Sequence, residues 1–137
     1  MSVVVAFAPT PEGRAALARA GEECRLRDAE LVIVKTAGSR LPDGVGPEDY
    51  EAELAEACRK LEASGVSCDV REVDGESPPA EDVLTVATQT AAEVIVIGLR
   101  RRTPVGKLLL GSNAQRILLD AQCPVLAVKA EATPQPG

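Results

Sequence analysis

The sequence predicts one α/β domain, built on an open parallel five-stranded sheet with helices on both faces. Five strand-like segments alternate strictly with four helix-like segments, and three of the strand-like segments are apolar throughout. Strict alternation is typical of parallel sheets, and fully apolar runs are typical of strands buried on both faces. The length of 137 residues suits a single domain. We expect that domain over residues 1–131, followed by a flexible C-terminal tail over 132–137.

The polarity of the five strand segments predicts their order in the sheet. Along the chain they lie at residues 3–7, 31–34, 66–73, 94–97 and 125–128. The third alternates apolar and polar side chains, and the fifth is preceded by Pro124, so both are expected at edges. With right-handed crossovers, the order in space is then 3-2-1-4-5, numbered along the chain.

Capping signals and apolar stripes predict the four helices. A Thr-Pro pair at residues 10–11 begins the first, which reaches about residue 28, and an acidic start and basic end mark the second at about 47–64. A Ser-Pro pair at 77–78 is expected to cap the third, and Ser-Asn-Ala-Gln at 112–115 has the form of a capping box for the fourth. The expected buried faces are Leu17, Ala20 and Cys24; Tyr50, Leu54, Ala57, Cys58 and Leu61; Val83, Leu84, Ala87 and Ala91; and Ile117, Leu118 and Ala121.

Composition excludes several classes of function. Histidine is absent, which excludes Ser/His/Asp and Cys/His nucleophilic sites and HExxH zinc sites. The only aromatic residues are Phe7 and Tyr50, too few for a surface that stacks the bases of single-stranded nucleic acid. The cysteines form no CxxC pair and are interpreted as buried, reduced thiols: Cys24, Cys58, Cys68 and Cys123.

Charge and hydropathy favour a soluble cytoplasmic protein that binds neither nucleic acid nor membrane. No apolar run approaches the roughly 20 residues of a membrane span, and residues 1–5 lack the features of a signal peptide. The net charge of -6 disfavours a nucleic-acid partner. Residues 98–129 nevertheless carry six cations against one anion, a local field that suits a small anion.

The candidate site lies where the strand order reverses, between the first and fourth strands. Ligands of open α/β sheets bind at that point, beyond the carboxyl ends of the strands, and the two loops there are residues 8–12 and 98–113. Gly98 is expected to end the fourth strand in a sharp turn. The first amides of the fourth helix could hold a phosphate, with arginines adding charge. The alternative is that the glycines only make turns, Ser112 only caps its helix and the arginines are solvated.

Residues 94–129 resemble the universal stress protein family. They contain Val-Ile-Val-Ile-Gly at 94–98, Leu-Leu-Leu-Gly-Ser at 108–112 and Cys-Pro-Val-Leu-Ala-Val at 123–128, and the order of elements along the chain also matches. The resemblance implies a Rossmann-like fold of that family and a non-catalytic regulatory role in stress response. It also implies that ATP, another adenine nucleotide or another phosphorylated ligand binds between the two loops.

Two positions depart from the family's nucleotide-binding pattern. Its motif, Gly-x2-Gly-x9-Gly-Ser/Thr, falls here on Gly98, Arg101, Gly111 and Ser112, so arginine replaces the second glycine. Arg101 would either block the phosphate channel or pair with a phosphate. Ala8 stands where such relatives usually carry an aspartate, and the family's adenine contact falls at Val34. The expected ligand-binding residues are Ala8, Pro9, Thr10, Val34, Gly98, Arg100, Arg101, Gly111, Ser112 and Asn113.

Two further readings compete with the nucleotide-binding regulator. One is a slow ATPase using Mg²⁺, although the loops offer only Glu12 as a nearby carboxylate. The other is a family member that has lost its ligand and acts as a dimeric interaction protein. The resemblance implies a homodimer paired through the last strand, at Val125, Leu126, Ala127 and Val128. The alternative is a monomer whose edge is shielded by Pro124, Lys129 and the tail.

Overall fold

A computed structural model describes residues 1–102 and 107–130, with only the backbone described over residues 101, 102 and 107–109. The predicted tail, residues 132–137, lies outside the described part. The strands are β1 (Ser2–Phe7), β2 (Glu30–Lys35), β3 (Cys68–Arg71), β4 (Ala92–Arg102), β5 (Lys107–Leu109) and β6 (Val125–Lys129). The helices are α1 (Pro11–Arg27), α2 (Pro47–Ala63), α3 (Pro79–Gln89) and α4 (Ser112–Asp120), with a 3-10 turn, η1 (Gly38–Arg40).

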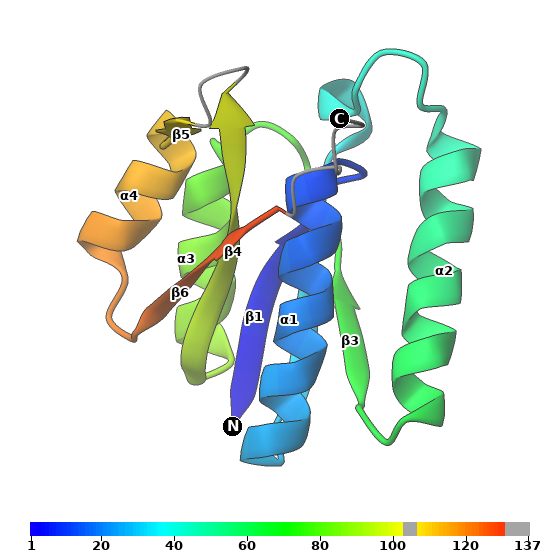
Figure 1. Ribbon diagram of the computed structural model, residues 1–137, viewed down its shortest axis with the longest axis vertical. Coiled ribbons are helices and arrows are strands. Elements are labelled where there is room, and N and C mark those ends of the chain that lie inside the picture. The colour runs from blue at the N-terminus through cyan, green and yellow to red at the C-terminus, as the bar shows by residue number, and fades with distance from the viewer. Residues whose placement is uncertain (103–106, 131–137) are drawn as a thin grey trace, which may run out of the picture.

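The predicted parallel sheet is confirmed. Five strands run parallel in the order β3-β2-β1-β4-β6, which is the predicted 3-2-1-4-5 order because β6 is the fifth predicted strand. Figure 1 shows β1 rising from the N-terminus, with the carboxyl ends of β1 and β4 at the same end of the molecule. The short strand β5 adds an antiparallel pairing along residues 100–102 of β4.

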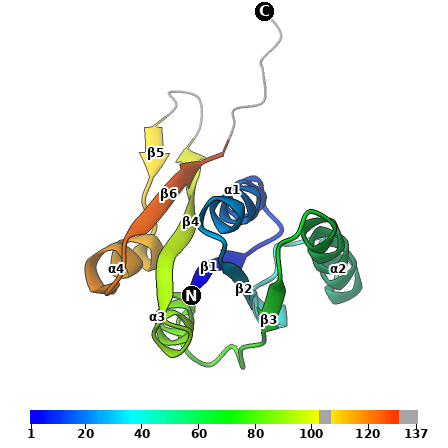
Figure 2. The same cartoon turned by 90° about the horizontal axis from the view of Figure 1, so that it is seen from below.

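The sheet separates two apolar cores. Alternate residues of β1 point to opposite sides, so Val3 and Val5 pack with α1 and α2, whereas Val4 packs with α3 and α4. Figure 2, seen from below, shows α1 and α2 on one side of the sheet and α3 and α4 on the other. The central strands are almost completely buried, as their apolar sequences predict.

Gly98 corrects the expected end of the fourth strand. The residue lies inside β4 and pairs with Val128, and the strand continues to Arg102. A Cβ on Gly98 would lie 2.1 Å from the carbonyl oxygen of Glu12. The glycine therefore allows α1 to pack closely against β4, and it makes no turn.

Helix α3 begins one residue later than the Ser-Pro pair predicts. Pro79 follows Pro78, and a residue before proline is disfavoured in the helical conformation. Pro78 accordingly has ψ 144° and serves as the N-cap, while Pro79 occupies the first helical position. Ala91, expected on the buried face of this helix, lies beyond its end at φ 50° and is exposed.

The capping box predicted for α4 is wrong. Gly111 is the N-cap, so Ser112 and Gln115 are the first and fourth helical residues and cannot form that motif. The Gln115 Nε2 amide donates to the carbonyl oxygen of Leu110 instead, at 3.0 Å. Ile117 is buried as expected, but Leu118 is 42% exposed.

All four cysteines are free thiols, as expected, but only Cys24 is fully buried. Burial raises the pKa of Cys24 to about 11 and that of Cys68 to about 12, so both thiols stay protonated at neutral pH. Within the described residues, no helix is long and apolar enough to cross a membrane.

Gly98→Ala should destabilise the fold by about 1–3 kcal/mol, because the new Cβ forces α1 away from β4. Urea unfolding measures the change. Gly38→Ala is the matched control: none of the described atoms lies within 4 Å of the Cβ it would add and its φ is not positive, so it should not destabilise the fold by more than about 0.5 kcal/mol. Equal stabilities for the two variants would contradict the close contact.

Candidate functional site

A cavity of about 580 Å³ opens at the carboxyl ends of β1, β2 and β4. This is the predicted edge of the sheet, where the strand order reverses. Six of the predicted ligand-binding residues line it: Ala8, Thr10, Val34, Gly98, Arg100 and Asn113. Pro9, Gly111 and Ser112 are not among its lining residues, and the side chain of Arg101 lies outside the described part.

The loop after β1 is held tightly against the start of α1. Thr10 caps the helix, because its Oγ1 accepts a hydrogen bond from the Gly13 amide at 3.0 Å. A Cβ on Gly13 would lie 2.0 Å from the carbonyl oxygen of Ala8. The Thr10 side chain therefore has a structural role, and the rim here is a fixed backbone surface.

Tyr50 joins the ends of β1 and β2 beside the cavity. Its buried hydroxyl donates to the Phe7 carbonyl oxygen at 2.7 Å and accepts from the Thr36 amide at 2.9 Å. Burial raises the pKa of Tyr50, so the hydroxyl keeps the proton that it donates. The rings of Phe7 and Tyr50 stack with centroids 5.5 Å apart. Both aromatic residues therefore support the sheet.

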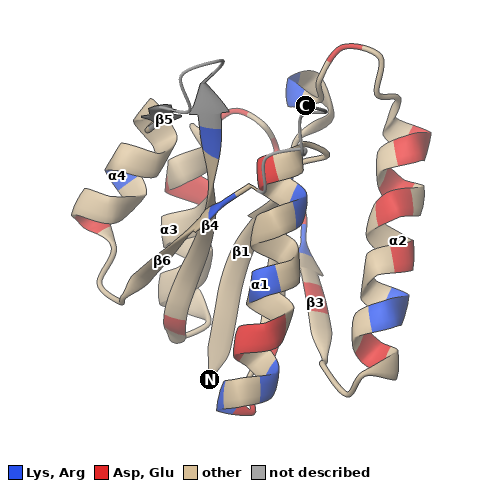
Figure 3. Cartoon of the chain, in the orientation of Figure 1, with Lys and Arg blue, Asp and Glu red and all other residues tan. Residues whose placement is uncertain are grey.

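The end of the cavity beside α4 suits an anion. Asn113 and Ala114, in the first turn of α4, line this end, and a helix N-terminus presents free amides and positive potential. The Asn113 side chain is engaged elsewhere, because its Oδ1 accepts from the Ala80 amide at 3.1 Å. Arg100 is 67% exposed and lies 3.5 Å from the Glu12 carboxylate, Nε to Oε1. Figure 3 shows that acidic positions dominate α2, which does not line the cavity.

Away from α4, the cavity lining combines apolar side chains with two cations and one unpaired carboxylate. The apolar residues are Val34, Ala37, Pro42, Val73 and Val83, and the cations are Lys35 and Arg40. Asp82, in the first turn of α3, also lines the cavity, and its Oδ2 is buried without a hydrogen-bond partner. Burial, followed by the negative charge of Asp74, raises the pKa of Asp82.

Sequence reasoning missed Asp82. In the sequence it is an acidic residue in the first turn of a helix, a place where carboxylates usually just complement the helix dipole. No sequence pattern could have revealed it, because only the folded structure brings the first turn of α3 beside the ends of β2 and β4.

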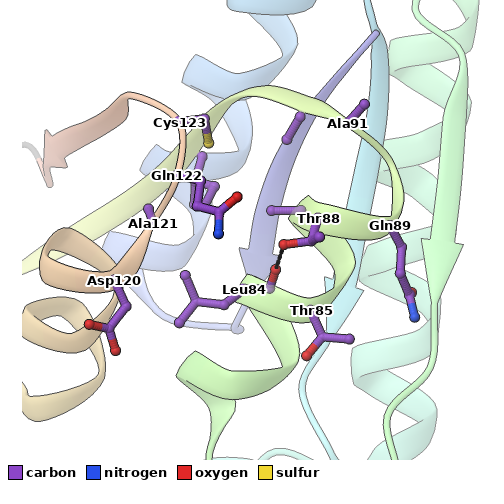
Figure 4. Close-up of a pocket in the computed structure, with 12 residues that line it drawn as sticks. Leu84, Thr85, Thr88, Gln89, Ala91, Asp120, Ala121, Gln122 and Cys123 are labelled. Carbon is purple, nitrogen blue, oxygen red and sulfur yellow. Dashed lines mark hydrogen bonds between the residues drawn. The ribbon is translucent and has the colours of Figure 1, made fainter.

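A second hollow, of about 650 Å³, lies at the opposite end of the sheet, between the end of α3 and the segment that leads into β6. Figure 4 shows Thr88 bonded within its own helix, where its Oγ1 donates to the Leu84 carbonyl oxygen at 3.1 Å. Asp120 is the only charged residue in the lining within the described part of the chain, so charged groups do not converge on one ligand position. The cavity at the carboxyl ends is therefore the candidate site.

Comparisons with known proteins agree with the fold. A family model described as the universal stress protein family matches residues 1–129. A universal stress protein of Mycolicibacterium smegmatis is 43% identical over 128 residues, which cover 93% of this chain and 96% of that protein. The universal stress protein from Archaeoglobus fulgidus solved with dAMP superimposes with a TM-score of 0.70 at 28% identity, over 94% of this chain and 98% of that one. A universal stress protein solved with cAMP superimposes with a TM-score of 0.69 at 25% identity, over 96% and 98%.

The raised pKa of Asp82 predicts a pH-dependent stability. Relative to Asp82→Asn, the wild-type protein should be most stable below pH 3.8, the ordinary pKa of the group, and should lose that advantage as pH rises through the raised folded value. The difference in melting temperature between the two proteins, measured from pH 3.5 to pH 7, tests this.

The matched control is Asp43→Asn, which removes the same charge at an exposed position. Its melting-temperature difference from wild type should stay nearly constant over the same range. An Asp82→Asn difference that is also constant would contradict the desolvation of this carboxyl.

Proposed function

The chain belongs to the universal stress protein family, and we propose that it binds an adenine nucleotide in the cavity at the carboxyl ends of β1, β2 and β4. The observation that carries this proposal is the lining of the cavity, which combines the first turn of α4 and Arg100 with a separate group of apolar side chains, Val34, Val73 and Val83. These two groups match the phosphate and the base of a nucleotide. The volume of about 580 Å³ is suited to a ligand of this size.

The family's structures support an adenine ligand. Relatives of the same fold have been solved with dAMP and cAMP, and each is matched over nearly its whole length. In this chain, Val34 lines the apolar end, as expected for a base contact. Ala8 brings no polar side chain to the cavity, so the backbone and other elements must supply the polar contacts. The contribution of Arg101, blocking or pairing, stays a prediction.

We infer a regulatory role without catalysis. Among the described residues, two carboxylates line the cavity, and one of them, on Glu12, faces Arg100 in an ion pair. Glu12 is therefore poorly placed to activate water, and no group of three or more acidic or cysteine side chains among the described residues could hold a metal ion. The carboxylates of the cavity could contribute a ligand to Mg²⁺ only when the ion is bound to the phosphates of a nucleotide. The cytoplasmic location also stays a prediction.

A homodimer through β6 is the second part of the proposal. The strand pairs with β4 along one side, and pairing of its other side with a second copy would satisfy both edges at once. Exposed apolar side chains on the neighbouring helix α4, Leu118 and Leu119, support an interface on this side of the molecule. Leu126 and Val128 pack against the core, whereas Ala127 and Lys129 are the exposed positions of the strand.

Gly111→Val should weaken ATP, ADP and AMP binding about tenfold or more, because a branched side chain at the N-cap of α4 hinders access to the amides that hold the phosphate. Isothermal titration calorimetry measures the affinities, and a phosphate-release assay on the wild-type protein should show no turnover. Gly111→Ala, with the smallest side chain, should retain more of the affinity. Unchanged affinity in Gly111→Val would refute this phosphate position, and turnover would favour the ATPase.

Ala127→Asp should shift the protein from dimer to monomer, because pairing across a two-fold axis brings the two introduced charges close together. Light scattering at micromolar concentration measures the mass. Asp introduced at the exposed position of Ala52, on α2, is the matched control and should leave the dimer intact. A wild-type protein that is already monomeric would disprove the dimer.

A further inference from the structure

Two buried carboxylate oxygens lack a hydrogen-bond partner among the described residues, and they differ in their surroundings. One is Oε2 of Glu53, on α2, whose other oxygen pairs with Arg14 at 2.9 Å. The other is Oδ2 of Asp82, which lines the ligand cavity. Leaving a buried acceptor unpaired is unfavourable, and such a group calls for a specific explanation. At Asp82, a ligand in the cavity could supply the missing donor.

The cations near Asp82 do not satisfy this oxygen. Arg40 is close enough for its charge to lower the pKa of Asp82, but it does not donate to Oδ2. Its Nη2 donates instead to the carbonyl oxygens of Gly75 and Ser77, at 3.0 and 2.8 Å. Lys35 pairs with Glu51 and Glu72. No described side chain or amide donates to this oxygen, which leaves it available to a donor on a molecule in the cavity.

The position of Asp82 identifies which part of a nucleotide could provide that donor. A carboxylate repels phosphate, and the phosphate has a better place at the other end, beside α4 and Arg100. Val34, Val73 and Val83 line the cavity and belong to one apolar cluster. Asp82 precedes Val83 in α3 and feels the charge of Asp74, which follows Val73. The apolar walls beside Asp82 suit the flat faces of a base. On an adenine held between such walls, the donor at the edge of the ring is the exocyclic amino group.

This inference rests on the proposed nucleotide site: we propose that Asp82 recognises the base, because its Oδ2 accepts a hydrogen bond from the exocyclic amino group of adenine. This makes Asp82 a specificity-determining residue. A purine without that amino group would leave the buried carboxylate unpaired, and a site built around a hydrogen bond discriminates strongly against such an analogue. The carboxylate comes from α3, so the helix on the far side of the sheet from α1 selects the ligand.

The test compares AMP with purine riboside 5′-monophosphate, which lacks only the amino group, by isothermal titration calorimetry. The wild-type protein should prefer AMP about tenfold or more, as expected for a hydrogen bond to a charged group. Asp82→Ala should reduce that preference to about one, and Asp82→Asn, which keeps an acceptor oxygen without the charge, should retain part of it. Alanine suits this helical position, so the variant should fold.

Glu53→Ala is the matched control, because it removes the other buried unpaired carboxylate outside the cavity and should keep the wild-type preference. A wild-type protein that binds both ligands equally well overturns the role of Asp82 and leaves nucleotide binding intact. An Asp82→Ala variant that still prefers AMP also overturns the role of Asp82 and leaves nucleotide binding intact. Selective loss of affinity for AMP relative to 2′-deoxy-AMP in that variant would assign Asp82 to the ribose instead and overturn the proposal. Absence of nucleotide binding in the wild-type protein refutes the proposed function and this inference together.

Discussion

The site depends on how closely the first turn of α1 approaches the sheet. Two glycines make this possible: Gly13 lies under the carbonyl oxygen of Ala8, and Gly98 under that of Glu12, where a side chain would come within 2.0 and 2.1 Å. The first turn of α1 therefore packs closely against the ends of β1 and β4, and the loop joining β1 to α1 has little conformational freedom. The N-terminus of α4, Arg100 and the apolar end of the cavity are arranged around this fixed rim.

The shortage of reactive side chains shapes the chemistry open to this protein. Without histidine, and with both aromatic residues used to join the strands, the cavity offers backbone amides, a few charges and apolar walls. Such groups recognise and hold a ligand by shape, dipole and hydrogen bond. The one carboxylate in the lining with an unpaired buried oxygen, on Asp82, is then the most distinctive polar group in the cavity.

The sheet and the place of the cavity could be predicted because both follow from simple patterns. Apolar runs with polar edges determine the strand order, and the reversal in that order determines where ligands bind. The helix starts were harder to predict, and two of them differ from the expectation by one residue. Pro79 keeps Pro78 out of the helical conformation, so α3 begins one residue later. Gly111 serves as the N-cap of α4, so that helix begins one residue earlier. Gly98 could not be assigned to a strand interior, because its reason is a contact with Glu12, far away in sequence. Asp82 was missed for the same reason.

The sheet also acts as a partition between two nearly independent cores, one with α1 and α2 and the other with α3 and α4. Substitutions in separate cores share few neighbours, so their effects on stability should add, and each core can drift in sequence without a matching change in the other. The cavity is the exception, because Gly13 from one side and Val83 and Ile117 from the other all line it. Sequence change is therefore least restricted within each layer and most restricted where the layers meet, so covariation between the two layers should concentrate around the cavity.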